Sequence, residues 1–330
     1  MGKYFVTGGT QRKGAEGKEE WFSYGEAAIA LVDDSDGSVT NCVSYASPSG
    51  IRPDDKEANI VFKAGSRDGE RLLVCTQTEI LIYSISDFEL IKHISHPWLN
   101  DVHHVVVNED GNYLIANTGL DMVLELSPEG ELVRNLSVLP GTDVWDRFDR
   151  ETDYRKVVTT KPHGSHPNYV FEVNNELWVS RFIQKDLLCL SNPQKRIDIG
   201  IEKIHDGNIF DGKIYCTTVN GHLVISDPVT CAILNTYDLN ELTRSTKDLG
   251  WCRSLHVLEE DKVIVGFSRL RPSKIRENLQ WAKYMVGKRE FSGRLPTRIV
   301  LFDLTRGCIE WSIDLEKCNL NAVFSIIPAD

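Results

Sequence analysis

The sequence predicts an all-β fold, a six-bladed β-propeller whose first blade is closed by the C-terminal strand. The clearest unit lies at residues 101–138, where short runs rich in Val, Ile, Leu and Tyr alternate with Asp-Gly and Glu-Gly turns. This pattern is typical of four antiparallel strands joined by tight turns. Similar units recur along the chain, and one such sheet cannot bury both of its faces alone. We therefore expect the copies to stack in a single domain spanning residues 1–330.

The predicted strands account for six blades in chain order. Three strands, at residues 3–9, 27–33 and 38–45, begin an incomplete unit. Complete units follow at 58–95, 101–138, 168–200, 205–239 and 253–315, and a lone strand is expected at 322–328. The first complete unit is expected to open with the run NIVFKAG at 59–65. The lone last strand completes the first unit, which is how a closed ring fastens its first blade to its last.

Composition limits the classes of protein to consider. The 330 residues are 41% hydrophobic, and no apolar run approaches the roughly 20 residues that a membrane span needs. The first residues lack the basic and then apolar pattern of an export signal. The eight cysteines occur singly, several within strand patterns, so we expect reduced thiols in a cytoplasmic protein. The net charge of -11 argues against nucleic acid as the main partner.

The long connections all fall on one predicted face of the ring. Hairpins between first and second strands, and between third and fourth strands, are short. The connections on the other face carry the insertions, at residues 10–26, 46–57, 139–165, 240–251 and 269–297. Long loops on one rim of a compact fold are usually functional, although decoration without function is the alternative.

The last insertion contains a predicted helix at residues 273–290. Ser273 is a candidate N-cap, and apolar residues recur at Ile275, Leu279, Trp281 and Met285 with helical spacing. The pattern is equally compatible with a lid over the rim and with a helix that only packs against it.

Side chains capable of chemistry gather where inner strands begin and second strands end on this rim. The inner-strand starts carry His103, His104, His166, His205 and His256, together with Arg253. The second strands end at Gln77, Asn117, Arg181, Thr217 with Thr218, and Arg269. The fold would direct these side chains to the central axis. His93, His96 and His222 lie elsewhere in the chain and are expected on the surface.

Imidazoles converging from different blades predict a divalent metal site. His103, His166 and His205 are the first candidates for ligands. His256 is a weaker fourth, because residues three apart on a strand face opposite ways and Arg253 takes the inner face. Such ligands suit Zn, Fe or Mn with an open position for water or substrate. The alternative is a polar channel in which the histidines bind strand-end carbonyls or an anionic ligand.

Arginines near the same mouth predict an anionic group on the ligand. These residues are Arg181, Arg253, Arg269 and Arg271. Guanidinium groups bind carboxylate, phosphate or sulfate, whereas ion pairs with Asp101, Asp206 or Asp248 would explain one or two of them. As an enzyme, the protein would use His104 as general base and Arg253 or Arg269 to hold the substrate. Gln77, Asn117 and Thr218 would supply further substrate contacts.

Two resemblances extend this interpretation. KIHDGNIFDGKIYCTTV, VGFSR and DLTRG, within the last 170 or so residues, resemble segments of an uncharacterised bacterial β-propeller family, from which the insertion at 269–297 departs. That resemblance implies the fold. HHVVVNEDGNYLIANTGLDMVLELSPEG is similar to NHL-type blades, including those of peptidylglycine amidating lyase. The second resemblance implies a six-bladed ring with a metal held by axial histidines, one of them at the position of His103.

Two classes of function follow. The first is a metal-dependent enzyme of lyase, isomerase or oxygenase type that acts on a small polar or anionic molecule at the axis. The second is a scaffold that binds a protein or glycan, for which rim aromatics such as Trp21, Phe22, Trp98, Trp145 and Trp281 would form the contact surface. Neither nucleic acid nor a membrane is an expected partner, and the oligomeric state is left open.

Overall fold

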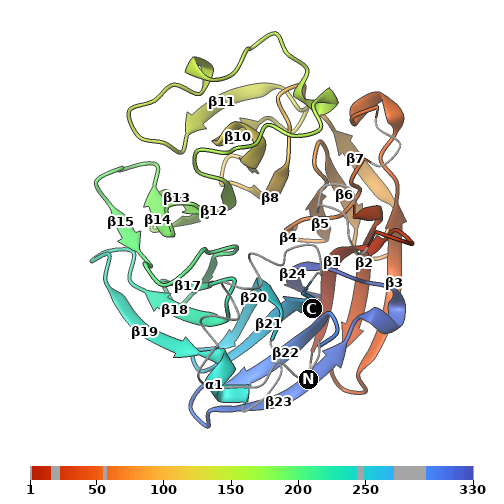
Figure 1. Cartoon of the computed structure of the whole chain (residues 1–330), viewed down its shortest axis with the longest axis vertical. Coiled ribbons are helices and arrows are strands. Elements are labelled where there is room, and N and C mark those ends of the chain that lie inside the picture. Colours follow the sequence, from red (N-terminus) through yellow and green to blue (C-terminus); the bar gives the residue numbers. More distant parts are fainter. Residues whose placement is uncertain (1, 16–22, 55–57, 244–248, 271–294, 330) are drawn as a thin grey trace.

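The computed structural model describes residues 2–15, 23–54, 58–243, 249–270 and 295–329. In these residues the chain forms a six-bladed β-propeller, which confirms the predicted fold class. Figure 1 looks along the axis and shows six four-stranded antiparallel sheets arranged around it. The predicted helix at 273–290 and Arg271 lie outside the described residues.

Five blades are continuous in sequence, and their strands run from the axis outward. Blade 2 holds β4 (Ser66–Asp68), β5 (Arg71–Cys75), β6 (Ile80–Ser84) and β7 (Leu90–Ile94). Blade 3 holds β8 (Val102–Val107), β9 (Tyr113–Asn117), β10 (Met122–Leu126) and β11 (Leu132–Ser137). Blade 4 holds β12 (Pro167–Val173), β13 (Glu176–Arg181), β14 (Asp186–Cys189) and β15 (Arg196–Asp198). Blade 5 holds β16 (Asn208–Phe210), β17 (Lys213–Thr217), β18 (His222–Ser226) and β19 (Ile233–Asp238). Blade 6 holds β20 (Trp251–Glu259), β21 (Lys262–Ser268), β22 (Arg298–Asp303) and β23 (Cys308–Asp314).

Blade 1 closes the ring by combining both ends of the described chain. Its order is β24 (Val323–Pro328), β1 (Lys3–Gln11), β2 (Tyr24–Asp33) and β3 (Ser38–Tyr45). The inner strand β24 pairs antiparallel with β1, from Tyr4 opposite Pro328 to Thr7 opposite Ser325. The hydroxyls of Thr7 and Ser325 are 2.7 Å apart and form a buried hydrogen bond. The predicted closure by the C-terminal strand is therefore confirmed.

Helical structure is confined to short turns between strands. The single α-helix in the described ranges is α1 (Leu239–Thr243). Single 3-10 turns occupy η2 (Ser49–Ile51), η3 (Thr118–Leu120), η4 (Val144–Asp146), η5 (Tyr154–Lys156) and η7 (Glu316–Cys318). These turns lie in the connections rather than within the blades.

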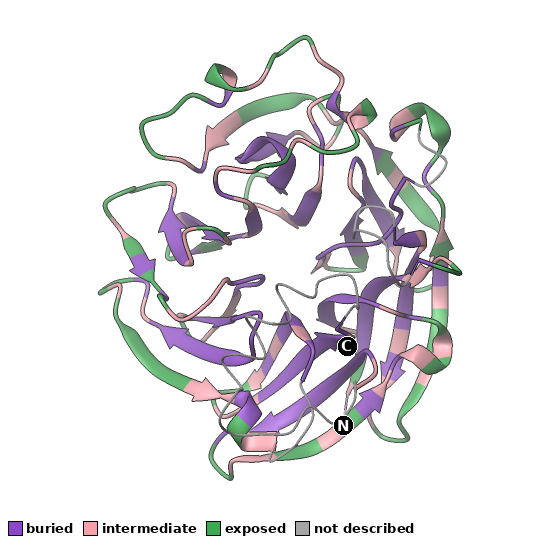
Figure 2. Cartoon of the chain, in the orientation of Figure 1, coloured by how far each residue is buried: buried purple, intermediate pink, exposed green. Residues whose placement is uncertain are grey.

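Burial follows the radial order of the strands. The second and third strands of blades 2 to 6 are buried almost throughout, whereas most residues of the outer strands β7, β11, β19 and β23 are exposed or half-buried (Figure 2). Apolar side chains from facing sheets meet between adjacent blades, as where Leu73 and Ile82 of blade 2 pack with Val105 and Ile115 of blade 3. The core is thus a ring of layers between the sheets.

The run NIVFKAG at 59–65 is not the strand that its apolar pattern predicts. Its backbone N–H groups donate to several blades in turn: Ile60 to Tyr24, Phe62 to Gly8, Lys63 to Cys75 and Ala64 to His103. A strand would direct these bonds to one neighbour, so the inner strand of blade 2 is the three-residue β4 instead. The run is buried because it crosses the end of the ring between blades 1, 2 and 3. We call residues 59–65 the crossing segment.

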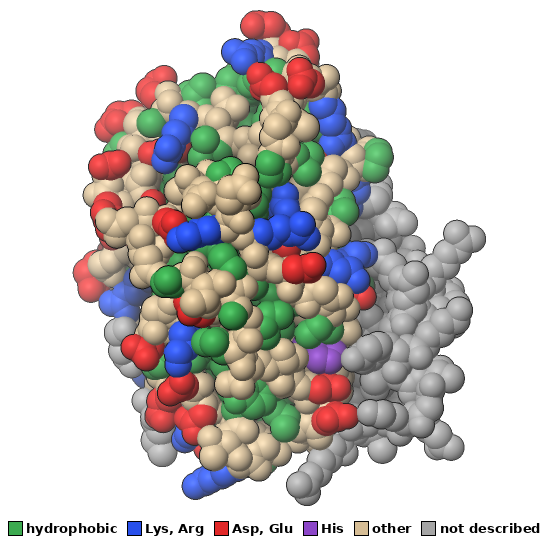
Figure 3. All heavy atoms as spheres, turned by 90° about the vertical axis from the view of Figure 1, so that its left-hand side faces the viewer, with side chains coloured by type: hydrophobic (Ala, Val, Ile, Leu, Met, Phe, Trp, Pro, Cys, Tyr) green, Lys and Arg blue, Asp and Glu red, His purple; other side chains and the backbone are tan. Residues whose placement is uncertain are grey.

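The outer wall carries no single dominant charge where it can be seen from the side of blades 4 and 5. Acidic, basic and hydrophobic side chains alternate over that wall (Figure 3). None of the described helices has the length and apolar content that crossing a membrane requires.

A substitution at Gly8 tests the closure of the ring, because the pairing of β1 with β24 leaves no room for a side chain there. A Cβ built on Gly8 would overlap the backbone carbonyl of Ala322, just before β24. We expect Gly8→Ala to lower the free energy of unfolding by about 1–3 kcal/mol, as overpacking does. Gly50, around which no atom lies within 4 Å of an added Cβ, is the matched control. Urea unfolding should show Gly50→Ala within about 0.5 kcal/mol of the wild type, and equal effects of the two changes would contradict this account.

Candidate functional site

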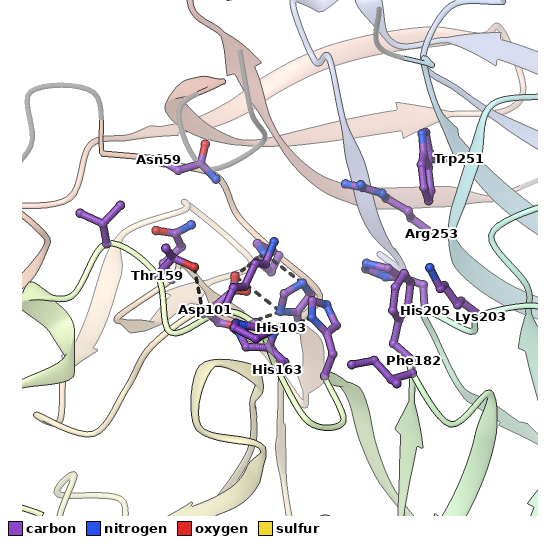
Figure 4. Close-up of a pocket in the computed structure, with 17 residues that line it drawn as sticks. Asn59, Asp101, His103, Thr159, His163, Phe182, Lys203, His205, Trp251 and Arg253 are labelled. Atoms are coloured by element: carbon purple, nitrogen blue, oxygen red, sulfur yellow. Dashed lines mark hydrogen bonds and ion pairs between the residues drawn. The ribbon is translucent and has the colours of Figure 1, made fainter. Parts of the chain in front are cut away.

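One pocket of about 320 Å³ lies at the axial end of the ring where blades connect to each other. Its lining comes from the crossing segment, the β5–β6 and β13–β14 loops, the 139–165 insertion, the β15–β16 connection and the starts of β8, β12 and β20. The residues are Asn59, Lys63, Gln77, Asp101, His103, Val158, Thr159, Lys161, Pro162, His163, His166, Phe182, Ile183, Lys203, His205, Trp251 and Arg253. Figure 4 shows Trp251, Arg253, His205, Lys203 and Phe182 on one wall, across from Asp101, His103 and His163.

Positive charge dominates this pocket in a protein whose net charge is -11. Three lysines and one arginine line it, together with four histidines, and Asp101 is the one carboxylate among the described lining residues. A cluster of cations within a concave, partly desolvated surface raises the local concentration of anions. The pocket is therefore suited electrostatically to an anionic ligand.

Asp101, Lys63 and His103 form a bonded group at the base of the pocket. The Lys63 Nζ lies 3.0 Å from the Asp101 Oδ1 and 3.0 Å from the His103 Nε2. Burial disfavours the charged carboxylate, but Lys63 and neighbouring histidines outweigh it and hold the pKa of Asp101 well below its usual range. The His103 Nδ1 lies 2.7 Å from the backbone carbonyl of Asp101 and donates to it, so its Nε2 accepts from Lys63.

His163 and His166 form a second pair, with their Nδ1 atoms 2.8 Å apart. The Thr160 hydroxyl donates to the Gly119 carbonyl and lies 3.3 Å from the His163 Nε2, which we assign as the protonated nitrogen. The His163 Nδ1 then accepts from the His166 Nδ1–H, which leaves the His166 Nε2 as an acceptor. Burial lowers the pKa of both histidines, so both are neutral at pH 7.

Asp121 holds the backbone that carries this pair. Its carboxylate accepts hydrogen bonds from the N–H groups of Gly164, Ser165 and His166, at 2.6, 2.9 and 2.7 Å, and from Arg147 at 2.7 Å. His166 has a φ of 63° and Asp101 a φ of 48°, a left-handed conformation that non-glycine residues rarely adopt. Such strain persists where surrounding contacts fix it, and here it occurs at two pocket residues.

One aromatic ring contacts several of these basic side chains. Phe324, on the closing strand β24, has its ring centre 5.4 Å from the Lys63 Nζ, 4.9 Å from the Arg253 Cζ and 5.8 Å from the His205 ring. On the pocket wall, Lys203 lies 5.0 Å above the Phe182 ring. Cation–π contacts of this kind stabilise positive charge without neutralising it.

Five of the residues predicted from sequence meet in this pocket: Gln77, His103, His166, His205 and Arg253. The His103 ring lies 5.0 Å from that of His166 and 5.6 Å from that of His205, centre to centre. Convergence of these side chains was the basis of the predicted site.

The structure places His104 and His256 outside this pocket. His104 follows His103 on β8 and therefore faces the other way, where its ring stacks on Tyr169 at 3.5 Å and burial lowers its pKa to about 3. His256 packs against Tyr4 with ring centres 5.9 Å apart, and burial lowers its pKa to about 4. Neither lines the pocket, so His104 is not positioned as its general base.

Four other predicted contacts also lie outside the pocket lining. Arg181 forms a buried ion pair with Asp186 and donates to the Val138 carbonyl. The side chains of Asn117 and Thr218 bond to nearby backbone and side-chain groups. Arg269 pairs with Glu316 at 3.3 Å. Each side chain is thus bonded to neighbouring groups outside the pocket, in its own blade or in an adjacent one.

Of the three histidines expected on the surface, His222 is buried instead, and its Nδ1 lies 3.1 Å from the Asn220 Oδ1. His93 is exposed, as predicted, with its Nε2 3.0 Å from the buried carboxylate of Glu79. His96 is half-buried.

Sequence reasoning missed several residues of the pocket, above all Lys63, His163 and Lys203. Lys63 was read as part of a strand, although a lone lysine in an apolar run signals a buried charge that needs partners. His163 lies inside a long insertion, where no strand periodicity fixes its direction. Asp101 was considered only as an ion-pair partner, yet it precedes two histidines at an inner-strand start.

Comparisons with known proteins agree on the fold. No protein-family model and no curated protein sequence matches the chain. A protein of unknown function from Bacteroides caccae superposes with a TM-score of 0.64 at 12% identity, over 99% of each chain. A chain of a nidogen/laminin complex gives a TM-score of 0.58 at 8% identity, over 100% of this chain and 99% of that one. The WD40 propeller domain of Doa1 gives 0.51 at 13% identity, over 88% and 76%.

Identities this low establish the architecture alone. The predicted resemblance to an uncharacterised bacterial propeller is confirmed at that level by the protein from Bacteroides caccae. The residues of the pocket must therefore be interpreted from their own chemistry.

Asp121 should govern the position of His163 and His166. In Asp121→Asn one acceptor oxygen becomes an NH₂ group that faces N–H donors. We expect the free energy of unfolding to fall by about 1.5–3 kcal/mol, the range for hydrogen bonds to a charged group. The ring resonances of His163 and His166 should shift in NMR spectra. The control is Asp143→Asn, because Asn can still cap the short helix that Asp143 caps in the same insertion. This control should change neither the free energy of unfolding nor the ring resonances. Unchanged resonances in Asp121→Asn would rule out the positioning role.

Proposed function

We propose that this protein is an enzyme that binds a small organic anion in the axial pocket and transfers a proton on it, as a lyase or isomerase does. The observation that carries the proposal is the composition of the pocket. Four cationic side chains and two imidazoles with lowered pKa surround a single carboxylate. Cations attract and orient the anion, and neutral imidazoles are the usual groups for proton transfer near pH 7.

In this proposal the Nε2 of His166 accepts the proton. The tautomers assigned above leave that nitrogen with a lone pair, while its Nδ1–H donates to His163. The imidazolium that forms strengthens this hydrogen bond and is stabilised by the nearby carboxylate of Asp101. Negative charge that develops on the substrate meets Lys63 and Arg253, fixed in advance by their contacts with Phe324.

Anion binding is the first test. Succinate, malonate, phosphate and pyrophosphate are added in turn, and Tm is measured. We expect at least one anion to raise Tm of the wild type and to lose this effect in Lys203→Gln/Arg253→Gln. The double variant Lys3→Gln/Arg306→Gln removes the same charge at exposed positions and should respond like the wild type. Equal responses of both double variants, or none in the wild type, would rule out the anion pocket.

Proton transfer is tested separately with His166→Asn. Asn tolerates the left-handed backbone that His166 adopts, so the loop should keep its conformation while the imidazole is lost. Succinate and malonate are each incubated with the protein in D₂O, and exchange of the C–H protons next to their carboxylates is followed by NMR. We expect exchange with the wild type and its loss in the variant, with binding retained.

A specific observation supports a second candidate, a metal-dependent reaction. Ligand atoms of Asp101, His163 and His166 all lie within 4.8 Å of one another. Nitrogen and carboxylate donors of this kind fit zinc or a similar divalent ion, which would polarise a carbonyl or lower the pKa of a water. The set predicted from sequence fits less well, because the His103 Nε2 already accepts from the Lys63 ammonium.

Elemental analysis tests the second candidate. Protein purified from medium containing Zn, Fe and Mn should hold about one equivalent of metal if this triad binds it. His163→Ala should lose the metal, whereas His103→Gln should keep it, since His103 is outside the triad. Metal-free wild-type protein, or loss in both variants, would exclude the proposed triad.

A scaffold role remains the alternative to both. One structural neighbour comes from a nidogen/laminin complex, and that likeness extends to the fold alone. The anion tests above separate the classes, because a protein-binding face has no need of a cationic pocket on the axis.

A further inference from the structure

The pocket changes from charged to apolar between its base and its mouth. Lys63, His103, His205 and Arg253 are each no more than 6% exposed, which places them at the base. Val158 and Ile183 also line the pocket but are 36% and 46% exposed, and Phe182 is half-buried beside Ile183. In this pocket the charged side chains are therefore buried and the apolar ones are exposed. An ordinary protein core has the opposite arrangement.

The exposed apolar residues at the mouth are unusual for this chain. Among the described residues, the other large hydrophobic side chains of comparable exposure lie on outer strands or their hairpins: Leu90, Ile91, Leu132, Val133, Val229, Ile233, Leu234 and Ile309. Val158 and Ile183 instead come from two separate connections and face one opening. Exposed apolar surface around a concave site marks a place where ligand surface is covered.

Cations and apolar groups are also adjacent on the wall. The Lys203 Nζ lies above the Phe182 ring, with no carboxylate within ion-pair distance among the residues described. The Arg253 Cζ lies 5.7 Å from the Trp251 ring centre. A ligand that reached these cations with a charged group would place its remaining atoms against Phe182 and Ile183.

We propose that the ligand is an amphiphilic organic anion that enters head first. A carboxylate or phosphate head would bind Arg253 and Lys203, and an apolar body would lie against Phe182, Ile183 and Val158 at the mouth. This inference rests on the proposed anion pocket and adds the class of substrate to it. The volume of about 320 Å³ is at the small end of ligand pockets, which suits a short chain or one ring.

A homologous series tests the inference. Dissociation constants of acetate, butyrate and hexanoate are measured by calorimetry, with methyl, butyl and hexyl phosphate as the second head group. We expect Kd to fall by up to about fourfold for each added methylene, which corresponds to ~0.8 kcal/mol. The series with the lower Kd identifies the preferred head group.

Matched variants locate the effect. Val158→Ser/Ile183→Ser should flatten the dependence on chain length, while Val229→Ser, an exposed apolar change on the outer side of blade 5, should leave it intact. Arg253→Gln should weaken every member of a series by a similar factor. Circular dichroism and Tm confirm that each variant is folded.

Two results would overturn the inference. If acetate or methyl phosphate binds but Kd does not change with chain length, the apolar mouth plays no part and the anion pocket still stands. If no carboxylate or phosphate of either series binds the wild type, the anion pocket fails as well.

Discussion

The antiparallel pairing of β24 with β1 is the constraint on which the pocket depends. It closes six sheets into a ring, and only in a closed ring do Lys63, Asp101, His166, Lys203 and Arg253 reach one axis from separate blades. The crossing segment reinforces the closure, because its N–H groups bond to blades 1, 2 and 3 in succession. Ordering these side chains costs conformational entropy. That cost is offset by packing and hydrogen bonding throughout the ring rather than by contacts within the site alone.

A cluster of positive charge at this depth needs local compensation. Asp101 supplies one negative charge, and Lys63 joins it to His103 through two hydrogen bonds. The Phe324 ring contacts Lys63, Arg253 and His205. Burial lowers the pKa of His163 and His166, so these two imidazoles add no positive charge at pH 7. Among the described lining residues the cations therefore outnumber the single carboxylate of Asp101. The proposed anionic ligand would add negative charge to this group.

The sequence predicts the blades well because strand alternation and turn residues are local signals. It also locates His103, His166, His205 and Arg253, since the starts of inner strands converge in any propeller. The prediction fails for His104, because adjacent residues of a strand face opposite sides of the sheet. His103 lines the pocket, whereas His104 stacks on Tyr169. The prediction also fails in the insertion that carries His163, whose direction depends on the distant carboxylate of Asp121.

Phe324 has a consequence for biosynthesis. It lies on the strand that leaves the ribosome after all the others, yet it forms the floor beneath cations contributed by blades 2 and 6 and their connections. A nascent chain that already holds five finished blades still lacks that floor. The proposed anion pocket would therefore be complete only once β24 has paired with β1, so ligand binding would report that blade 1 has closed.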